Sequence, residues 1–222
     1  MSGITYDYME QYIRELIPSN IGILEELEKF SITNRVPIVQ KETAKFLELI
    51  ITMKRPKKIL ELGTAIGYSA ILMNLASGGV SEIVTIERDE KMIEIANDNI
   101  KKYGLLSKIT VLKGECLETL ESLKDEYDLI FMDAGKGHYN HFLPHCLRLL
   151  KKEGVLIADN VLFRGMVASK QLATRRKITI IKRMKSYLEL VSNNDDLITS
   201  VIPMGDGISV TMRKNSVIIK EE

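Results

Sequence analysis

The chain has few of the features that mark secreted, membrane-spanning or disulfide-stapled proteins. Only two cysteines, Cys116 and Cys146, occur among its 222 residues, and they form no Cys-x-x-Cys pair. We therefore expect no disulfide framework and a reducing compartment. No basic segment followed by an apolar stretch opens the chain, and no apolar run approaches the ~20 residues of a membrane span. These absences predict a cytoplasmic protein with no membrane partner.

Linkers and an excess of one charge are also lacking. Lysine and arginine number 31 against 30 acidic residues, so the net charge of +1 gives no global sign for or against nucleic-acid binding. No internal repeat or Pro/Ser-rich linker divides the sequence, and 45% of the residues are hydrophobic. We expect a single domain over residues 1–222, with N-terminal helices at 1–55 and a core at 56–222.

Apolar periodicity separates a helical beginning from an alternating remainder. The first part has three segments with apolar residues at helical spacing, Tyr6–Ile17, Ile21–Phe30 and Lys41–Lys54. Short apolar runs then alternate with longer amphipathic ones. Strands are predicted at Lys58–Leu62, Glu82–Glu87, Ile109–Lys113, Tyr127–Met132 and Gly154–Asp159, and helices at Tyr68–Ala76, Glu90–Tyr103, Leu117–Leu123, Tyr139–Leu150 and Arg175–Val191.

This alternation is typical of an α/β fold, in which helices cover both faces of a mainly parallel sheet. Two last apolar runs, Leu197–Ile202 and Ile208–Arg213, are joined by residues 203–207 alone. Because so short a connection cannot hold a crossover helix, this pair must be antiparallel.

Acidic residues end or closely follow each of the first five predicted strands. They are Glu61, Glu87, Glu115, Asp133 and Asp159. Ligands of open parallel sheets bind outside the carboxyl ends of the strands, so five carboxylates would gather around one crevice. Such a cluster suits cationic ligands, since unpaired acids would repel one another and take up protons. The alternative for each position is a helix cap or a first-turn acid stabilised by the helix dipole.

The loop after the first predicted strand contains two glycines, Gly63 and Gly67. Their Gly-x-x-x-Gly spacing departs from the Gly-x-Gly-x-x-Gly fingerprint of dinucleotide-binding proteins. Glu87 ends the next strand, 20 residues after Gly67, at a position suited to accepting hydrogen bonds from ribose hydroxyls. The loop therefore favours a nucleoside cofactor other than a dinucleotide.

Four segments are distinctive in combination: Glu61–Ser69, Asp133–Tyr139, Asp159-Asn160 and Gly205-Asp206-Gly207. Together they resemble the cation-dependent O-methyltransferases of the catechol and caffeoyl-CoA type, over nearly the whole chain. The resemblance implies a Rossmann-like class I methyltransferase with a seven-stranded sheet whose last strand is antiparallel, usually in a homodimer. Within that family the chain looks most similar to the bacterial tRNA 5-hydroxyuridine methyltransferases, through residues 36–38, 63–69 and 159–163.

The resemblance also implies roles for individual residues. Around S-adenosylmethionine it places a set of side chains and backbone groups: Val39, Glu61, Gly63, Ser69, Glu87, Glu115, Cys116 and Asp133. It assigns a divalent metal to Asp133, Asp159 and Asn160. Relatives often carry Asp-Ala or Ser-Gln after Gly114, where this chain has Glu115-Cys116, so the chain departs from the family's pattern at the adenine contact.

The implied metal site has a recognisable chemistry. Two carboxylates and an amide oxygen form a hard, all-oxygen donor set that suits Mg²⁺ or Mn²⁺ better than Zn²⁺. With Asp133, Lys136 is our catalytic candidate, as the group that takes or stabilises the proton of the acceptor hydroxyl; the alternative is a solvated surface lysine. For the two aspartates and Asn160 the alternative is ordinary turn chemistry.

A basic segment is hidden by the balanced total charge. Residues 160–188 contain eight lysines and arginines and no acid, so the rest of the chain carries −7. Because this segment follows Asp159-Asn160, we expect it to border the site and to bind tRNA at the anticodon loop. The predicted tRNA contacts are Arg164, Arg175, Arg176, Lys177, Lys182 and Arg183.

The predicted reaction is methylation of the 5-hydroxyl of 5-hydroxyuridine, whose O5 and O4 form a vicinal pair able to chelate magnesium. Three alternatives remain: a small catechol- or caffeoyl-CoA-like acceptor, a binding module without catalysis, and a nucleotide-dependent oxidoreductase. The complete metal triad argues against the second, and the loop spacing argues against the third. The basic residues could equally recognise a CoA-type phosphate or form a solvated helix face.

Overall fold

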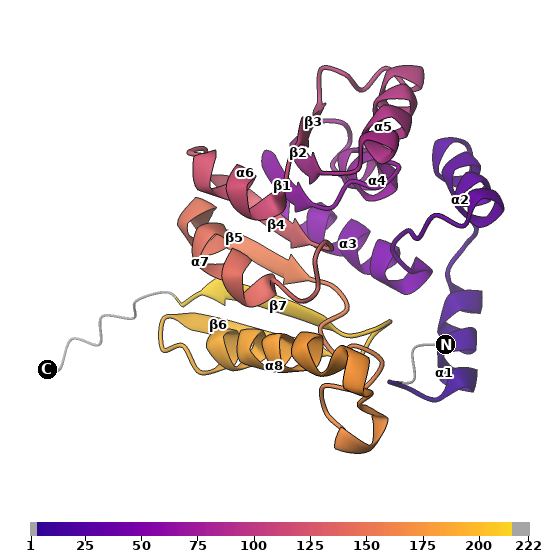
Figure 1. Cartoon of the computed structure of the whole chain (residues 1–222). Helices are drawn as coiled ribbons and strands as arrows, with labels where there is room; N and C mark the ends of the chain where they lie inside the picture. Colours follow the sequence, from indigo (N-terminus) through magenta and orange to yellow (C-terminus); the bar gives the residue numbers. More distant parts are fainter. Residues whose placement is uncertain (1–3, 215–222) are drawn as a thin grey trace, which may run out of the picture.

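One seven-stranded sheet organises the chain, in the computed structural model, which describes residues 4–214 (Figure 1). The strand order is β3-β2-β1-β4-β5-β7-β6. The strands are β1 (Lys58–Leu62), β2 (Glu82–Glu87), β3 (Ile109–Lys113), β4 (Tyr127–Met132), β5 (Leu150–Ala158), β6 (Leu197–Ile202) and β7 (Ile208–Arg213). The first five strands pair in parallel, and β7 runs antiparallel to both of its neighbours.

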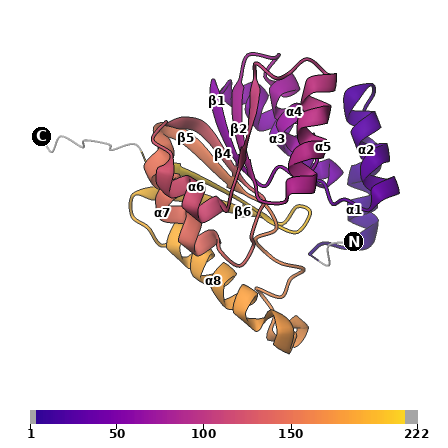
Figure 2. The same cartoon turned by 45° about the horizontal axis from the view of Figure 1, so that its top comes forward.

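Helices cover both faces of this sheet (Figure 2). Those of the first half are α1 (Asp7–Leu16), α2 (Ile23–Asn34), α3 (Lys41–Lys54), α4 (Tyr68–Ala76) and α5 (Glu90–Lys102). Those of the second half are α6 (Cys116–Ser122), α7 (Tyr139–Leu149) and α8 (Ile178–Ser192), with 3₁₀ turns at Lys170–Leu172 and Arg175–Lys177. The arrangement is the Rossmann-like methyltransferase fold expected from the sequence.

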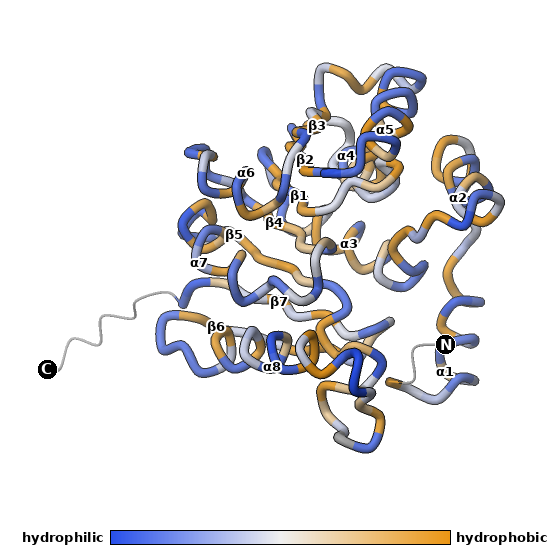
Figure 3. The backbone as a smooth tube through the Cα atoms, in the orientation of Figure 1, coloured by the Kyte–Doolittle hydropathy of each residue, from blue (hydrophilic) through white to orange (hydrophobic). Residues whose placement is uncertain are grey.

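Two apolar cores result from the alternation of side chains along the central strands. Leu129 and Phe131 of β4 face the core shared with α2 to α5, whereas Ile130 and Met132 face the core shared with α6 to α8. The tube in Figure 3 is accordingly apolar along much of β5. Leu27 of α2 is buried in the first core, so the N-terminal helices pack as part of the same body as the sheet.

The predicted elements agree with the structure in type and order, and most of their ends differ by no more than two residues. Three boundaries differ more: α2 ends at Asn34, four residues after the predicted Phe30, and the starts of β5 and α8 are displaced. Strand β5 begins at Leu150, four residues before the predicted start. Its first part is polar and pairs with β4 through an irregular register, so the apolar pattern did not indicate a strand there. Helix α8 begins at Ile178, three residues later than predicted, after a 3₁₀ turn over Arg175–Lys177. Three adjacent cations at a helix start oppose the positive end of its dipole, which explains the delay.

Two further expectations concern cysteine and membranes. Cys116 and Cys146 are both free thiols. Among residues 4–214, no helix combines the length and the apolar content needed to cross a bilayer.

The turn at residues 205–207 offers a test of local packing. Gly207 has φ +87°, and a Cβ on it would lie 2.7 Å from Leu162 Cβ, so Gly207→Ala combines backbone strain with a clash. We expect it to lower the free energy of unfolding by about 2–4 kcal/mol, measured by urea denaturation.

Gly78→Ala is the matched control. Gly78 also has positive φ, +69°, but a Cβ there would meet nothing within 4 Å. Its loss should be only about 1 kcal/mol. Equal losses in the two variants would show that the contact with Leu162 is irrelevant.

Candidate active site

The acidic residues predicted at one edge of the sheet do converge there. Glu61 lies on β1, which pairs with β4, and Asp133 follows β4 directly. Asp159 follows β5, the next strand along, and is 2% exposed. Glu87 ends β2 on the other side of β1. Glu115 lies outermost, where its carboxylate pairs with Arg88 at 3.3 Å and is 58% exposed.

Two adjoining hollows open above these strand ends. The first, of about 580 Å³, is lined by Asp133, Asp159 and Asn160 together with Val39 and Ser69. The second, of about 740 Å³, is lined by Glu115, Cys116 and residues of the loop before α7. Gly63, Glu87, Ala134, Lys136 and Phe163 border both. The two hollows therefore form a continuous site that could hold an elongated ligand across the edge of the sheet.

Glu61 lies beneath the first hollow rather than in its wall. It is fully buried, and its Oε2 accepts a hydrogen bond of 2.6 Å from Thr85, which in turn bonds Thr64. Oε1 has no hydrogen-bond partner among the described residues. Burial raises the pKa of Glu61 to about 7, although the hydroxyls of Ser69 and Thr85 favour the charged form. Beneath the first hollow, Glu61 is thus a buried acid that forms no ion pair within the described residues.

Asp133 and Asp159 are a second group of buried acids whose pKa values are raised. Burial raises the pKa of both carboxyls, and the charge of Asp133 raises that of Asp159 further. Lys136 opposes these shifts by lowering both pKa values, while Asp206 adds to the rise at Asp159. One lysine therefore faces several acids, an arrangement that a bound cation would stabilise.

The loop after β5 has an unusual backbone. Asn160, Phe163 and Arg164 all have positive φ, between 46° and 59°, a conformation that costs free energy in residues other than glycine and is least unfavourable for Asn. The loop is held by Asp206, whose Oδ1 accepts a hydrogen bond from the Arg164 N–H. The Asn160 N–H also donates to Asp159 Oδ1 at 2.7 Å. Strained residues held in this way often mark functional loops.

Glu87 is held in place by backbone donors. Its Oε2 accepts from the Ala65 N–H at 3.0 Å, and Oε1 accepts from the N–H groups of Arg88 and Asp89. These bonds connect the loop after β1 with the end of β2 and orient the carboxylate at the border of both hollows. Capping of the following helix α5 is done by Asp89, so helix capping does not explain Glu87.

The predicted cofactor residues are therefore distributed along the site. Val39, Gly63, Ser69, Glu87 and Asp133 border the first hollow, and Glu115 and Cys116 border the second. Gly63 has a packing reason in addition: a Cβ on it would lie 2.9 Å from Ala134 Cβ. Their roles toward a ligand stay predictions.

Half of the predicted tRNA-binding residues reach the hollows. Arg164 and Lys177 line the first, and Lys177 Nζ lies 5.1 Å from the centre of the Phe163 ring. Arg183 lines the second and donates to the Gly137 carbonyl at 3.1 Å. Arg175, Arg176 and Lys182 are exposed outside the walls. None of these six side chains forms an ion pair within residues 4–214.

The predicted metal ligands have a mixed donor set. Across the described chain, no group of three or more His, Cys, Asp or Glu side chains is placed to hold a metal. The triad has two carboxylates and the amide of Asn160, all lining the first hollow. Its hard oxygen donors fit Mg²⁺ or Mn²⁺. Metal binding stays a prediction.

Sequence reasoning assigned no role to Gln40, Tyr68, Phe163 and Asp206, all of which line the first hollow. Asp206 belongs to the motif Gly205-Asp206-Gly207, so the sequence did contain a signal that this residue lies near the site. Tyr68 belongs to the segment Glu61–Ser69, so that motif was a usable signal for it as well. Gln40 precedes α3, well before the first strand, where no local pattern indicates a site.

Comparison with known proteins places this site in a family. The O-methyltransferase family model matches residues 15–214. A solved structure from Staphylococcus aureus, provisionally named a caffeoyl-CoA O-methyltransferase, has 31% identity and a TM-score of 0.86, covering 94% of this chain and 100% of that one. The SAH-bound methyltransferase PaMTH1 of Podospora anserina has 25% identity and a TM-score of 0.85, with 94% and 95% covered.

A catechol O-methyltransferase of Niastella koreensis is 36% identical over 133 residues, which are 58% of this chain and 60% of that protein. The class is thus defined: the chain is an enzyme that transfers a methyl group to an oxygen atom. It belongs to the O-methyltransferase family whose named members include catechol and caffeoyl-CoA O-methyltransferases.

Glu61 links the stability of the ligand-free protein to pH. Its folded-state pKa of about 7 lies above the ordinary 4.5, so its contribution to stability is fully present below pH 4.5 and is lost as pH rises through 7. Glu61→Gln should reduce the fall in unfolding free energy across this range by about 3 kcal/mol, measured by urea denaturation at successive pH values. Glu94→Gln, on the exposed surface of α5, controls for the substitution. An unaltered pH profile in Glu61→Gln would contradict this assignment.

Proposed function

We propose that the two hollows bind S-adenosylmethionine and a divalent metal, and that the enzyme methylates a hydroxyl that lies beside a second oxygen on its acceptor. The observation that carries this proposal is the group of acids Glu61, Asp133 and Asp159, buried or half-buried at one sheet edge, where burial raises the pKa of all three and Lys136 opposes the rise at the two aspartates. A sulfonium centre and a metal ion are the cations that would stabilise these carboxylates.

Support for the cofactor comes from the site and from the relatives. The SAH-bound relative shares this fold and closely similar dimensions. In this chain, Glu87 is oriented to accept hydrogen bonds from ribose hydroxyls, and Glu115 and Cys116 border the second hollow, where the adenine would lie. The cofactor supplies an electrophilic methyl group on a positively charged sulfur.

Asp133, Asp159 and Asn160 would hold the metal, with Mg²⁺ preferred for its oxygen ligands. The metal supplies positive charge that lowers the pKa of an acceptor hydroxyl. Lys136 borders both hollows and is placed to take the hydroxyl proton or to stabilise the resulting oxyanion. The residues around the hollow would then hold the acceptor oxygen in line with the methyl group, which carries much of the rate in such a transfer.

Two acceptor classes fit these requirements, and each has its own support. The names of relatives favour small hydroxylated aromatics of the catechol or caffeoyl-CoA type. The rim of this chain favours a polyanion, because Arg164, Lys177 and Arg183 border the hollows with no acidic partner within the described residues. A tRNA anticodon loop carrying 5-hydroxyuridine would combine a vicinal oxygen pair with phosphates. Acceptors of both classes present two adjacent oxygens to the same triad.

Removing a carboxylate of the triad tests the metal. Asp133→Ala should reduce methyl transfer at least about 100-fold and abolish Mn²⁺ binding measured by electron paramagnetic resonance. The variant should not lose thermal stability, since it removes an acid that lacks a cation. Asp98→Ala, on the exposed face of α5, is the control. Full turnover by the wild-type enzyme in the presence of a chelator would refute a metal role.

Neutralising the basic turn tests the acceptor. Changing Arg175, Arg176 and Lys177 to Gln should weaken binding of tRNA containing 5-hydroxyuridine and reduce the slope of its salt dependence by about 2–3. The control triple replaces Lys101, Lys124 and Lys152, which are exposed on other parts of the surface. If caffeic acid is methylated and the tRNA is neither bound nor methylated, the small-molecule acceptor is correct.

A further inference from the structure

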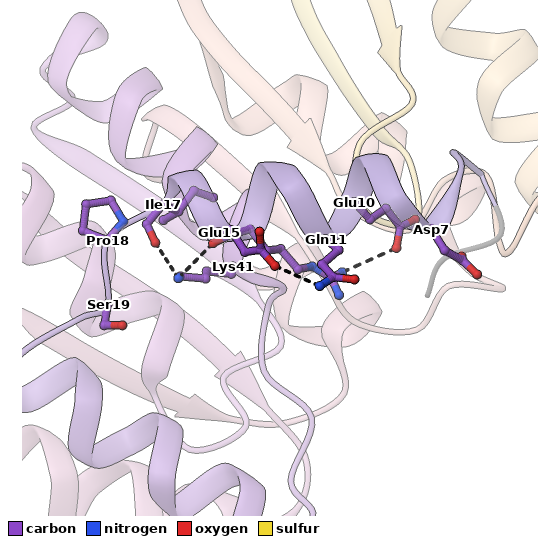
Figure 4. A pocket seen from close by; sticks show the side chains of 9 residues that line it. Asp7, Glu10, Gln11, Glu15, Ile17, Pro18, Ser19 and Lys41 are labelled. Carbon is purple, nitrogen blue, oxygen red and sulfur yellow. Dashed lines mark hydrogen bonds and ion pairs between the residues drawn. The ribbon is translucent and has the colours of Figure 1, made fainter.

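Helix α1 is attached to the body in an unusual orientation. Its apolar side chains point outward, with Tyr8, Tyr12 and Leu16 exposed by 58–66%, and Glu10 is its one buried residue. The contact with the body is therefore polar. Figure 4 shows Glu10 and Gln11 along this helix, and Lys41 of α3 reaching its carboxyl end. An isolated helix of ten residues is only marginally stable, so these polar contacts fix its position.

Arg14 is the centre of this attachment. Its guanidinium binds the nearly buried carboxylate of Glu42 through two hydrogen bonds, of 2.9 and 2.7 Å. A third bond, of 2.9 Å, runs from Nη2 to Oε1 of Gln40. Lys41 lies between these partners and donates to the Arg14 and Ile17 carbonyls at the end of α1. Three consecutive residues at the start of α3 thus hold one helix, and the first of them, Gln40, also borders the reaction site.

Gln40 lines the first hollow together with the triad. A Cβ on Gly205 would lie 3.2 Å from Gln40 Oε1, so this side chain packs against the turn that carries Asp206. Asp206 in turn acts on Asp159, one of the predicted metal ligands. The acceptor, and not the adenosine part of the cofactor, would occupy this side of the hollow.

The hydrogen bond from Arg14 determines which end of the Gln40 side-chain amide remains free to bind a ligand. A guanidinium only donates hydrogen bonds, so it must face the amide oxygen of Gln40. The Nε2 group, with two N–H donors, is left with no partner in the described chain. Arg14 thereby orients an amide whose donor end is free at the border of the acceptor site.

We propose that Gln40 determines acceptor specificity by donating a hydrogen bond from Nε2 to an acceptor oxygen, and that Arg14 is the positioning residue that holds the amide in this orientation. The inference rests on the proposed function, because it takes the first hollow to be the acceptor site. It makes α1 a functional part of that site.

Two substitutions at Gln40 separate this role from a structural one. Gln40→Glu keeps the partner of Arg14 and removes both donors, whereas Gln40→Met removes the donors without adding charge. The probes are caffeic acid and 5-hydroxyuridine, and their equilibrium binding to the protein saturated with SAH and Mg²⁺ is measured by calorimetry. The comparison uses whichever probe the wild-type protein binds more tightly. Both variants should bind that probe about tenfold more weakly than the wild-type protein does. SAH affinity should stay unchanged in both variants, and the melting temperature should stay unchanged in Gln40→Glu, which keeps the partner of Arg14.

Arg14 is tested through its coupling to Gln40. Arg14→Lys keeps a positive charge beside Glu42 but cannot make all three hydrogen bonds, and we expect it to weaken binding of the probe severalfold. In the Gln40→Met background the same change should add less than twofold, because the amide that Arg14 orients is already gone. The control for Gln40→Glu is Gln11→Glu, the same Gln-to-Glu change on the exposed side of α1 outside the hollow. It should leave binding of the probe unaltered.

The outcomes separate this proposal from the proposed function. A wild-type protein that binds a probe but never methylates it contradicts the proposed function, while the binding data still test Gln40. The specificity role is overturned if Gln40→Met binds the probe within twofold of wild type, if it weakens SAH binding as much as probe binding, or if the wild-type protein binds neither probe.

Discussion

Burial of carboxylates at the carboxyl ends of β1, β4 and β5 is the constraint on which the site depends. Glu61 is completely enclosed, and Asp133 and Asp159 lie on neighbouring strand ends. Removing such groups from water raises their pKa values, and their mutual repulsion adds to the effect. An ordinary protein surface would place these acids in solvent. Cationic ligands would explain their retention here, because the unfavourable energy of unpaired buried carboxylates would then contribute to binding.

The rest of the fold keeps these acids in place. Parallel pairing of β1 with β4 and of β4 with β5 brings their ends to one edge. The Thr64–Thr85 pair restrains Glu61 from below, and Asp206 restrains the strained loop after β5 from the side. The close approach of Gly63 to Ala134 brings the first loop against the end of β4. Each restraint joins residues that are far apart in sequence, so the charge cluster depends on the tertiary structure and not on one motif alone.

How much of the fold and of the site could be predicted from the sequence depends on how far apart in sequence the interacting residues lie. Strands such as Tyr127–Met132 were predicted to the residue, because acidic residues bound a short, largely apolar run that Asp128 alone interrupts. The acids at strand ends followed from the rule for parallel sheets. The start of α8 was placed three residues early, because Arg175–Lys177 contains no Gly or Pro to mark a helix boundary, while its three adjacent charges disfavour the helix. The bond between Arg14 and Gln40 spans 26 residues, and no pattern in one sequence indicates such a pairing.

Charge is layered across the site, and this layering bears on the acceptor. The floor is acidic, through Glu61, Asp133 and Asp159, whereas Arg164, Lys177 and Arg183 border the hollows above it. A wholly anionic acceptor would be repelled by the floor unless a metal lay between them. A neutral catechol would make no use of the basic rim. The best match is an acceptor with a polar, metal-binding head and an anionic body, a description that fits both a nucleotide within RNA and an aromatic ester of CoA. In either case the basic rim would bind the anionic body, and the acidic floor, with its cations bound, would act on the head.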